Sequence, residues 1–326
     1  MSKAALVAVQ NLGVEFATRR GRLKAVVDLN LAIEEGELFC LVGESGCGKS
    51  VTALALMRLL PEEALQSGTV RFRGRDLGSF GWRDLSGLRG SQISMIFQDP
   101  FESLNPLMRI GDWIRETLEA HRMLSGRAAR QRVLELLEEV RIPDPERFAK
   151  SYPHEASGGM RQRAMIATAL SCSPSFLIAD EPTTALDVTT QAEILSLLSD
   201  IRKRRGMTVL FITHDLALVS QIADRVGVMY AGRLVEVAPS GEFFKMPQHP
   251  YSRALLECSP RLEVLGAPLA AIQGEVPNPL ARPAGCAFHP RCPIAVERCR
   301  EEDPALDHRG GDESHQVACW EWDKWL

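Results

Sequence analysis

The sequence lacks any apolar run long enough to cross a membrane, and it contains few aromatic residues. Its longest stretch without a charged side chain, residues 164–179, is shorter than the about 20 residues of a membrane-spanning helix. The first residues lack the apolar block and cleavage site of a signal peptide, so we expect a cytoplasmic protein. Aromatic residues make up 6% and apolar residues 45%, as in ordinary globular proteins, which excludes disordered, collagen-like and coiled-coil classes.

An excess of positive charge is also absent. The chain has 38 Lys and Arg against 42 Asp and Glu, a formal net charge of −4. Because no general basic field can hold a phosphate backbone, nucleic acid is not the expected partner.

The sequence also has no internal repeat. Its 326 residues suit one large domain with additions, or two ordinary domains.

The eight cysteines are unevenly distributed. Four of them, Cys286, Cys292, Cys299 and Cys319, lie within the last 41 residues. A disulfide framework is unexpected in a reducing cytoplasm, so this cluster predicts a metal site, for which His289 and His315 are alternative ligands. The C-x5-C-x6-C-x19-C spacing is wider than that of common zinc sites, which disfavours zinc.

The order of apolar segments predicts an α/β fold. Residues 37–42 form a strand-like run before a glycine-rich loop, and a helix is predicted over 51–60. Two further strands, at 176–179 and 208–212, end in polar residues and are separated by a helix that stops at Gly206. A crossover helix implies a parallel sheet, with the site along its carboxyl edge.

Other segments depart from this pattern. Two amphipathic helices between residues 110 and 142 indicate an inserted helical subdomain. Residues 6–16 and 69–72 are expected in a small antiparallel sheet. Beyond about residue 239 the chain is rich in proline and cysteine, which predicts a separate appendix.

The glycine-rich loop carries the strongest motif. Residues 43–50, GESGCGKS, match the phosphate-binding pattern in which backbone amides hold phosphate, Lys49 reaches the terminal phosphates and Ser50 binds Mg²⁺. A chance glycine-rich turn is disfavoured by the strand before the loop and the helix after it. Cys47 is expected to be a small loop residue, with a pKa that the helix N-terminus could lower. Asp180 and Glu181 then offer a metal carboxylate and a base, although they could also be a helix-terminal charge pair.

Further motifs follow in order along the chain. They are Gln98-Asp99-Pro100, Ser157 to Arg163, Asp180 to Thr183, Ala185-Leu186-Asp187 and Thr213-His214-Asp215. Together with the phosphate loop, this series resembles the ATP-binding subunits of ABC transporters. The resemblance implies a P-loop ABC ATPase fold: a RecA-like parallel sheet core, a small antiparallel β subdomain and an inserted helical subdomain at about residues 100–172, plus a Cys-rich C-terminal appendix.

The resemblance also implies roles for these residues. Glu181 would polarise the attacking water, His214 would contact the γ-phosphate, and Ser50, Gln98 and Asp180 would hold Mg²⁺. Ser157 to Gly159 would close over ATP bound to a second subunit in a head-to-tail dimer. The residues expected to bind nucleotide are Phe16, Gly43, Glu44, Ser45, Gly46, Cys47, Gly48, Lys49, Ser50, Val51, Ser157, Gly158, Gly159 and Asp187. An isolated Phe such as Phe16 is as well explained as a core residue. Asp187 also suits a helix N-cap.

A narrower resemblance is to the oligopeptide and dipeptide importer ATPases. It rests on Tyr152-Pro153-His154-Glu155, on His249-Pro250-Tyr251 and on the segment from Gly285 to Cys292. It implies an ATPase domain over 1–240, a C-terminal region over 241–326 and a [4Fe–4S] cluster on the four clustered cysteines, with zinc as the alternative.

The same resemblance implies the partners. Val51 and Met160 are typical of the D-type subunit, which pairs with an F-type ATPase or a second copy of itself, and with two permeases. An extracytoplasmic binding protein would deliver the solute, and the chain would lie on the cytoplasmic face of the membrane. A soluble ABC ATPase acting on nucleic acid or ribosomes is the alternative function. A P-loop kinase is disfavoured because kinases lack the ABC signature sequence, which residues 157–163 resemble.

Overall fold

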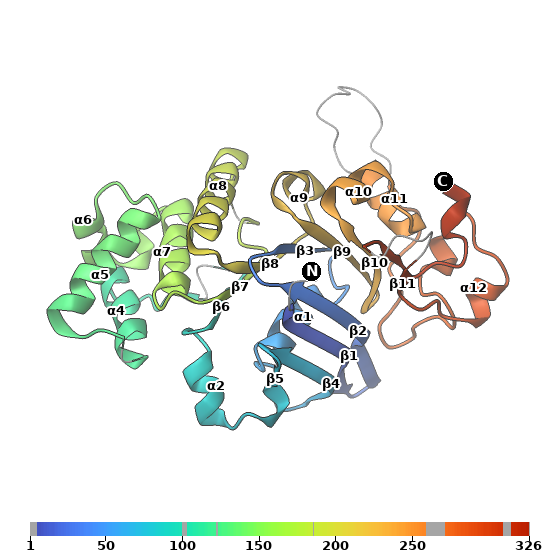
Figure 1. The fold of residues 1–326 in the computed structure, drawn as a ribbon, viewed down its shortest axis with the longest axis horizontal. Coiled ribbons are helices and arrows are strands. Elements are labelled where there is room, and N and C mark those ends of the chain that lie inside the picture. The colour runs from blue at the N-terminus through green and yellow to red at the C-terminus, as the bar shows by residue number, and fades with distance from the viewer. Residues whose placement is uncertain are drawn as a thin grey trace. The chain divides into compact units, whose positions relative to one another are not determined.

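The computed structural model describes residues 5–99, 103–121, 123–184, 186–258, 271–308 and 314–325. It divides into two compact units, one made of Met1–Gly78 with Ile212–Leu326 and the other of Ser79–Phe211. Figure 1 labels the helices and strands of both. The chain passes between the units in η1 (Leu77–Ser79) and in β8 (Thr208–Thr213). Within the described residues, no helix is long and apolar enough to span a membrane.

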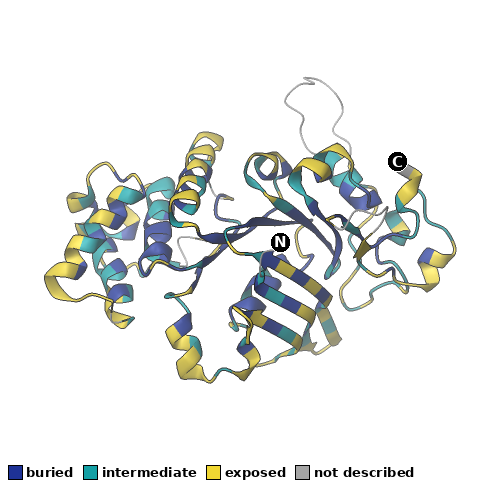
Figure 2. Ribbon diagram, in the orientation of Figure 1, coloured by how far each residue is buried: buried dark blue, intermediate teal, exposed yellow. Residues whose placement is uncertain are grey.

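The first unit contains a four-stranded antiparallel sheet in the order β2-β1-β4-β5. Its strands are β1 (Ala5–Thr18), β2 (Gly21–Glu34), β4 (Ala64–Phe72) and β5 (Arg75–Asp76). Buried and exposed residues alternate along parts of β1 and β2, as expected for a sheet with one covered face (Figure 2). The expected strands at 6–16 and 69–72 are confirmed.

A second sheet in this unit carries the glycine-rich loop. β3 (Leu38–Val42) is buried throughout and lies parallel to β9 (Arg225–Tyr230), which pairs antiparallel with β10 (Arg233–Pro239). Two short C-terminal strands, β12 (Gln316–Val317) and β11 (Asp307–His308), continue the sheet from β10. The C-terminal region therefore adds its own strands to this sheet.

The helices of the first unit begin with α1 (Lys49–Leu56). The predicted helix over 51–60 is too long at its end, because Arg58 adopts a left-handed backbone conformation with φ 53° that no α-helix continues. The remaining helices are α9 (Leu216–Ile222), α10 (Ser240–Lys245), α11 (Pro250–Cys258), η3 (His289–Arg291), α12 (Arg298–Glu301) and η4 (Trp322–Trp325).

The second unit is mainly helical. Its elements are α2 (Trp82–Leu88), β6 (Ile93–Ile96), α4 (Ile110–Ala120), α5 (Gly126–Glu139), α6 (Pro145–Lys150), η2 (Pro153–Glu155), α7 (Gly158–Leu170), β7 (Phe176–Asp180) and α8 (Val188–Arg205). Helices α4 to α7 pack on one another, and their apolar faces are buried (Figures 1 and 2). The two predicted amphipathic helices are thus confirmed as α4 and α5.

Two strands of this unit are fully buried and parallel. β6 pairs with β7 from Ile93 opposite Phe176 to Ile96 opposite Ala179. Helix α8 follows β7 and ends at Gly206, whose φ of 61° suits a C-terminal glycine. The predicted crossover helix and its stop are confirmed.

Candidate nucleotide-binding site

The glycine-rich loop leaves β3 and enters α1 through two positions that only glycine can occupy. A Cβ on Gly43 (φ 153°) would lie 2.2 Å from the Met229 carbonyl oxygen. A Cβ on Gly48 (φ 107°) would lie 2.4 Å from the Ala25 carbonyl oxygen. The backbones of β9 and β2 therefore press directly against the loop, so both glycines are needed for this close approach.

Lys49 opens α1 and is almost fully buried, with 5% of its surface exposed. Its Nζ donates hydrogen bonds to the carbonyl oxygens of Gly43 at 2.8 Å and Glu44 at 3.0 Å. The loop thus folds around the ammonium group, which places the positive charge inside the ring of backbone atoms. Such a loop, at the start of a helix, is suited to bind phosphate.

Cys47 lies inside this loop and is buried. Burial raises the pKa of its thiol, although the Lys49 ammonium, 3.7 Å from the sulfur, opposes the shift. The suggestion that the helix N-terminus lowers this pKa is therefore wrong, because loss of solvent around the thiolate outweighs the nearby positive charge. Cys47 is a small buried loop residue.

Glu44, the second residue of the loop, is held by residues that sequence reasoning missed. Arg291, in η3, donates to its carboxylate at 2.8 and 3.1 Å. The Glu44 backbone N–H donates to the Tyr251 hydroxyl at 2.9 Å. Tyr251 is fully buried although its hydroxyl is polar, and Arg291 lies in the Cys-rich segment, far from the loop in sequence.

The other expected residues of the first unit lie on three elements. Ser50 and Val51 are partly exposed on α1, and Phe16 is partly exposed on β1 opposite Leu23 and Ala64. His214 follows β8 and is exposed. Its neighbour Asp215 caps α9, accepting hydrogen bonds from the amides of the helix's first turn at 2.9 and 3.2 Å.

In the second unit, the expected metal and base residues follow β7. Asp180 ends the strand with 5% of its surface exposed, and Glu181 turns the chain with a left-handed φ of 45°. The Glu181 carboxylate accepts hydrogen bonds from Thr184 Oγ1 at 2.8 Å and from Gln98 Nε2 at 3.4 Å. Gln98 and Glu181 are thus brought together, which gives this edge two carboxylates and an amide.

The signature segment forms the start of α7 in the same unit. Ser157 caps the helix, accepting a hydrogen bond from the Met160 N–H at 3.3 Å. Ser157 is exposed, and Gly158 and Gly159 are partly exposed beside it. An exposed helix start with small residues can accept an anionic group from outside.

Asp187 begins α8 as an N-cap. Its carboxylate accepts from the Thr190 N–H at 3.0 Å and the Thr190 hydroxyl at 2.7 Å, and these hydrogen bonds lower the pKa of Asp187. The expected capping role is confirmed. Pro100 and Ala185, which belong to two of the recognised motifs, lie outside the described residues.

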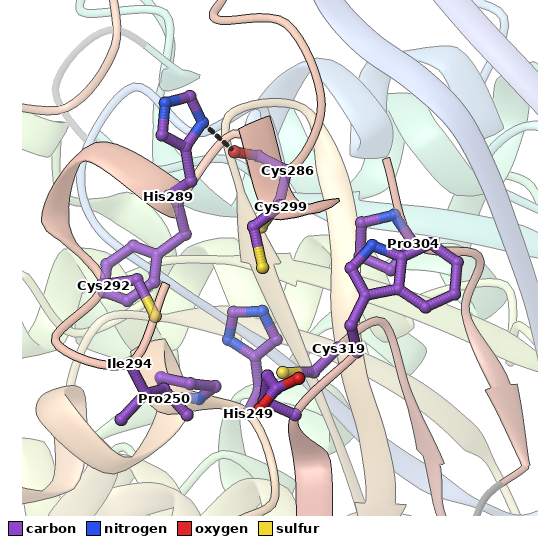
Figure 3. Close-up of a pocket in the computed structure, with 12 residues that line it drawn as sticks. His249, Pro250, Cys286, His289, Cys292, Ile294, Cys299, Pro304 and Cys319 are labelled. Carbon is purple, nitrogen blue, oxygen red and sulfur yellow. Dashed lines mark hydrogen bonds between the residues drawn. The ribbon is translucent and has the colours of Figure 1, made fainter. Parts of the chain in front are cut away.

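The four clustered cysteines line one cavity of the C-terminal region (Figure 3). Burial and the neighbouring thiolates raise the pKa of Cys286 to about 11 and that of Cys319 to about 12, and they also raise that of Cys292. His289 and His249 line the same cavity. In the part of the chain that is described, however, no three His, Cys, Asp or Glu side chains are arranged to hold a metal ion.

The other suggested ligand, His315, faces elsewhere. Its Nε2 lies 2.7 Å from Oε1 of Glu236, a fully buried carboxylate on β10. The backbone amides of Gln248 and His249 also donate to this carboxylate, at 2.7 and 2.9 Å. Burial lowers the pKa of His249 to about 4. Glu236 was missed, although a lone charge within an apolar strand is a signal of a buried polar network.

Comparisons with known proteins agree with this geometry. A profile described as ABC transporter matches residues 26–184, a profile of the oligopeptide/dipeptide transporter C-terminal region matches 235–299, and an AAA domain profile matches 149–220. The chain is 47% identical over 317 residues to the dipeptide transport ATP-binding protein DppD of Bacillus subtilis (strain 168), which covers 97% of this chain and 94% of that protein.

Solved structures are similar as well. The dimeric post-hydrolysis structure of the ATP-binding cassette MJ0796 with ADP and Pi has a TM-score of 0.65 and 29% identity, over 72% of this chain and 98% of that chain. The structure of cbiO1 from Clostridium perfringens, part of the ABC transporter complex cbiONQ, has a TM-score of 0.63 and 28% identity, over 74% of this chain and 92% of that chain.

Proposed function

The chain belongs to the ATP-binding subunits of ABC transporters and shares their P-loop ATPase fold, and from this we propose that it powers the import of peptides. The observation that carries the proposal is the match of residues 235–299 to the oligopeptide/dipeptide transporter C-terminal region. The similarity to a dipeptide transport protein over nearly the whole chain supports it. The comparisons favour a transporter over an ATPase that acts on nucleic acid.

We propose a role in ATP binding or hydrolysis for each of the expected site residues. Lys49 and the loop amides around Ser45 to Ser50 bind the phosphates, and Phe16 stacks on the base. Glu181 orients and polarises the attacking water, and His214 contacts the γ-phosphate. The Mg²⁺ that accompanies ATP neutralises phosphate charge, and Ser50, Gln98 and Asp180 are the residues that would hold it. The hydrogen bond of Gln98 to Glu181 supports a shared role for these two side chains.

We further propose that each ATP is held between two ATPase subunits. The exposed start of α7, with Ser157, Gly158 and Gly159, supports this, because its polar groups face outward. Asp187, at the start of α8, would also contribute to nucleotide binding. The partner would be an F-type subunit or a second copy, and a pair of permeases would bind the helical insert around residues 113–140. Because its relatives are named as ATP-binding proteins of peptide transport and import, the chain would sit on the cytoplasmic face of the membrane.

The C-terminal region, 241–326, is proposed as a distinct region that carries a [4Fe–4S] cluster on Cys286, Cys292, Cys299 and Cys319. Four thiols lining one cavity are the usual ligand set for such a cluster, which supports the assignment. The C-x5-C-x6-C-x19-C spacing is wider than that of common zinc sites, which disfavours zinc as the occupant. The cluster would act as a structural link and not as a redox centre.

The test of the function is ATP hydrolysis by the chain alone and by the assembled transporter. The isolated chain is expected to hydrolyse ATP slowly, and turnover is expected to rise when the second ATPase and the permeases are added. Peptide uptake by vesicles that contain the complex should require ATP. Full activity in a demonstrably monomeric preparation would contradict the shared site, and ATP-driven uptake that peptides neither support nor compete for would contradict the cargo class.

The cluster is tested by anaerobic purification followed by measurement of iron, sulfide and zinc and by visible spectroscopy. A broad charge-transfer band with about four irons per chain is expected. Cys299→Ser should abolish the band, whereas Cys40→Ser, at a buried cysteine in β3 outside the cluster, should keep it. One zinc per chain without iron would overturn the cluster, and no metal would overturn the site.

A further inference from the structure

The phosphate-binding loop is fastened to the C-terminal region at Glu44. This residue's carboxylate receives two hydrogen bonds from one guanidinium, a bidentate contact, and its backbone N–H is bonded to Tyr251. Arg291 and Tyr251 both come from the region after β10, 247 and 207 residues along the chain from Glu44. Two independent contacts from one distant region thus hold a single loop residue.

Arg291 is itself held firmly. Only 4% of its side chain is exposed, and its remaining donors reach the carbonyl oxygens of Gln273 at 3.0 Å and Ile272 at 3.3 Å and the Tyr230 hydroxyl at 3.4 Å. Its guanidinium also lies near the rings of Tyr230 and Phe288. A planar cation fixed on all sides is suited to fix the carboxylate that it binds.

Glu44 needs a cationic partner because its loop is built to bind phosphate, which is also negatively charged. The side chain is a carboxylate within a loop built for phosphate, and two like charges at short range repel each other strongly in a partly buried site. An arginine that neutralises the carboxylate removes this repulsion and at the same time fixes the loop. The Tyr251 contact adds to this by fixing the Glu44 amide.

We propose that Arg291 is a positioning residue of the nucleotide site, which neutralises and holds Glu44 so that the phosphate loop keeps its ATP-binding form. The proposal rests on the proposed function, because it assumes that this loop binds ATP. It makes the C-terminal region a working part of the ATPase, in addition to any role in holding a cluster. Tyr251 supports the same loop from its backbone side.

The test measures binding of a fluorescent ATP analogue with Mg²⁺ to the full chain. Arg291→Gln is expected to weaken binding about fivefold or more, because Glu44 is then left unpaired beside the phosphates. The double variant Glu44→Gln with Arg291→Gln should regain most of this affinity, since the unpaired charge is gone.

Arg298→Gln is the matched control. It removes a cation from the same region, where the guanidinium pairs with Glu302 and lies over Trp320, away from the phosphate loop. Its ATP binding should equal that of the wild type. Thermal unfolding of each variant checks the fold. Should Arg291→Gln fail to fold, Arg291→Lys keeps the charge without the bidentate contact and should bind about threefold less tightly.

Two results would overturn the proposal. One is an Arg291 variant that folds and binds the analogue as the wild type does. The other is a double variant as weak as Arg291→Gln alone. Either result leaves the proposed function standing as long as the wild type binds the analogue, whereas a wild type that does not bind it would contradict the proposed function as well.

Discussion

The phosphate loop and the signature segment both precede a helix and both rely on glycine, yet they are built differently. The phosphate loop is enclosed: two of its glycines meet neighbouring carbonyl oxygens, and the ammonium of Lys49 is almost fully buried. The signature segment is open: Ser157 is exposed, and the nearest atom to a Cβ on Gly158 would be a leucine methyl at 3.5 Å. One segment is shaped by its own chain, and the other presents its groups to the outside.

This difference indicates what each segment contributes. An enclosed loop has its binding form before nucleotide arrives, so the loss of entropy on binding is small. An open helix start gains its full interactions only when another molecule meets it. Changes in the phosphate loop should therefore impair the isolated chain, and changes in the signature segment should impair only the assembled transporter.

The largest effect is expected from the residues after β7 and from Lys49. Glu181→Gln should lower ATP hydrolysis by the assembled complex about 10²- to 10⁴-fold, because the proposed base is lost, while ATP binding is kept. Lys49→Ala should weaken ATP binding as well, because the charge inside the loop is lost. Measurements of steady-state hydrolysis and of equilibrium ATP binding distinguish the two variants.

Asp200→Asn serves as the control for charge, since Asp200 lies on α8 and pairs with Arg141, and both side chains are exposed and outside the recognised motifs. It should hydrolyse ATP at the wild-type rate. Near-wild-type turnover by Glu181→Gln would show that the base lies elsewhere.

The next largest effect is the difference between a glycine substitution in the phosphate loop and one in the signature segment. Gly48→Ala should abolish ATP binding by the isolated chain and lower its unfolding temperature, because the new methyl group meets the Ala25 carbonyl at 2.4 Å. Gly158→Ala should keep both properties, because that position is open and not left-handed. Hydrolysis by the assembled complex should nevertheless fall for Gly158→Ala. A Gly158→Ala chain with lost ATP binding would contradict the contrast between enclosed and open segments.

The sequence could predict the enclosed segment better than its surroundings. The strand-loop-helix order and the helix stop at Gly206 follow from local patterns and are confirmed, and β3 and β7 each belong to a parallel pair. The contact of Arg291 with Glu44 could not be predicted, because it joins residues 247 positions apart and depends on the tertiary fold. The early end of α1 was missed because the φ of Arg58 is set by its surroundings and not by propensity.

A smaller effect concerns the pH dependence of stability, through the buried His249 that contacts Tyr251. The Tyr251 N–H donates to Nδ1 of His249, whose pKa is lowered to about 4 by burial, against 6.5 when exposed. Between these two values the unfolded chain binds a proton that the folded chain does not. The free energy of unfolding should therefore be highest above pH 6.5 and should fall by about 1 kcal/mol per pH unit towards pH 4.

Thermal unfolding from pH 7.5 to pH 4.5 measures this dependence. His249→Gln should be less stable at neutral pH but should lose less stability on acidification. His308→Gln changes an exposed histidine of the same unit and should keep the wild-type pH profile. Equal pH profiles for wild type and His249→Gln would show that another group controls acid stability.

The smallest effect concerns the cap of the open segment. Ser157→Ala removes the acceptor for the Met160 N–H and should lower the free energy of unfolding by about 1 kcal/mol. Ser157→Thr keeps a hydroxyl cap and should unfold almost as the wild type does. Chemical denaturation of both variants measures the difference. A Ser157→Ala chain as stable as the wild type would indicate that the serine is retained only for its outward contacts.

The contact between Glu44 and Arg291 also sets an order for folding on the ribosome. The phosphate loop is synthesised before Arg291, which follows Glu44 by 247 residues, and before the strand β12 that pairs with β10. Chains fold largely in the order of synthesis, and contacts between distant residues form late. The nascent ATPase therefore lacks the Arg291 contact that holds its phosphate loop until Arg291 has left the ribosome. A truncated chain that ends after β10 would keep the phosphate-binding sequence without the contacts that hold Glu44.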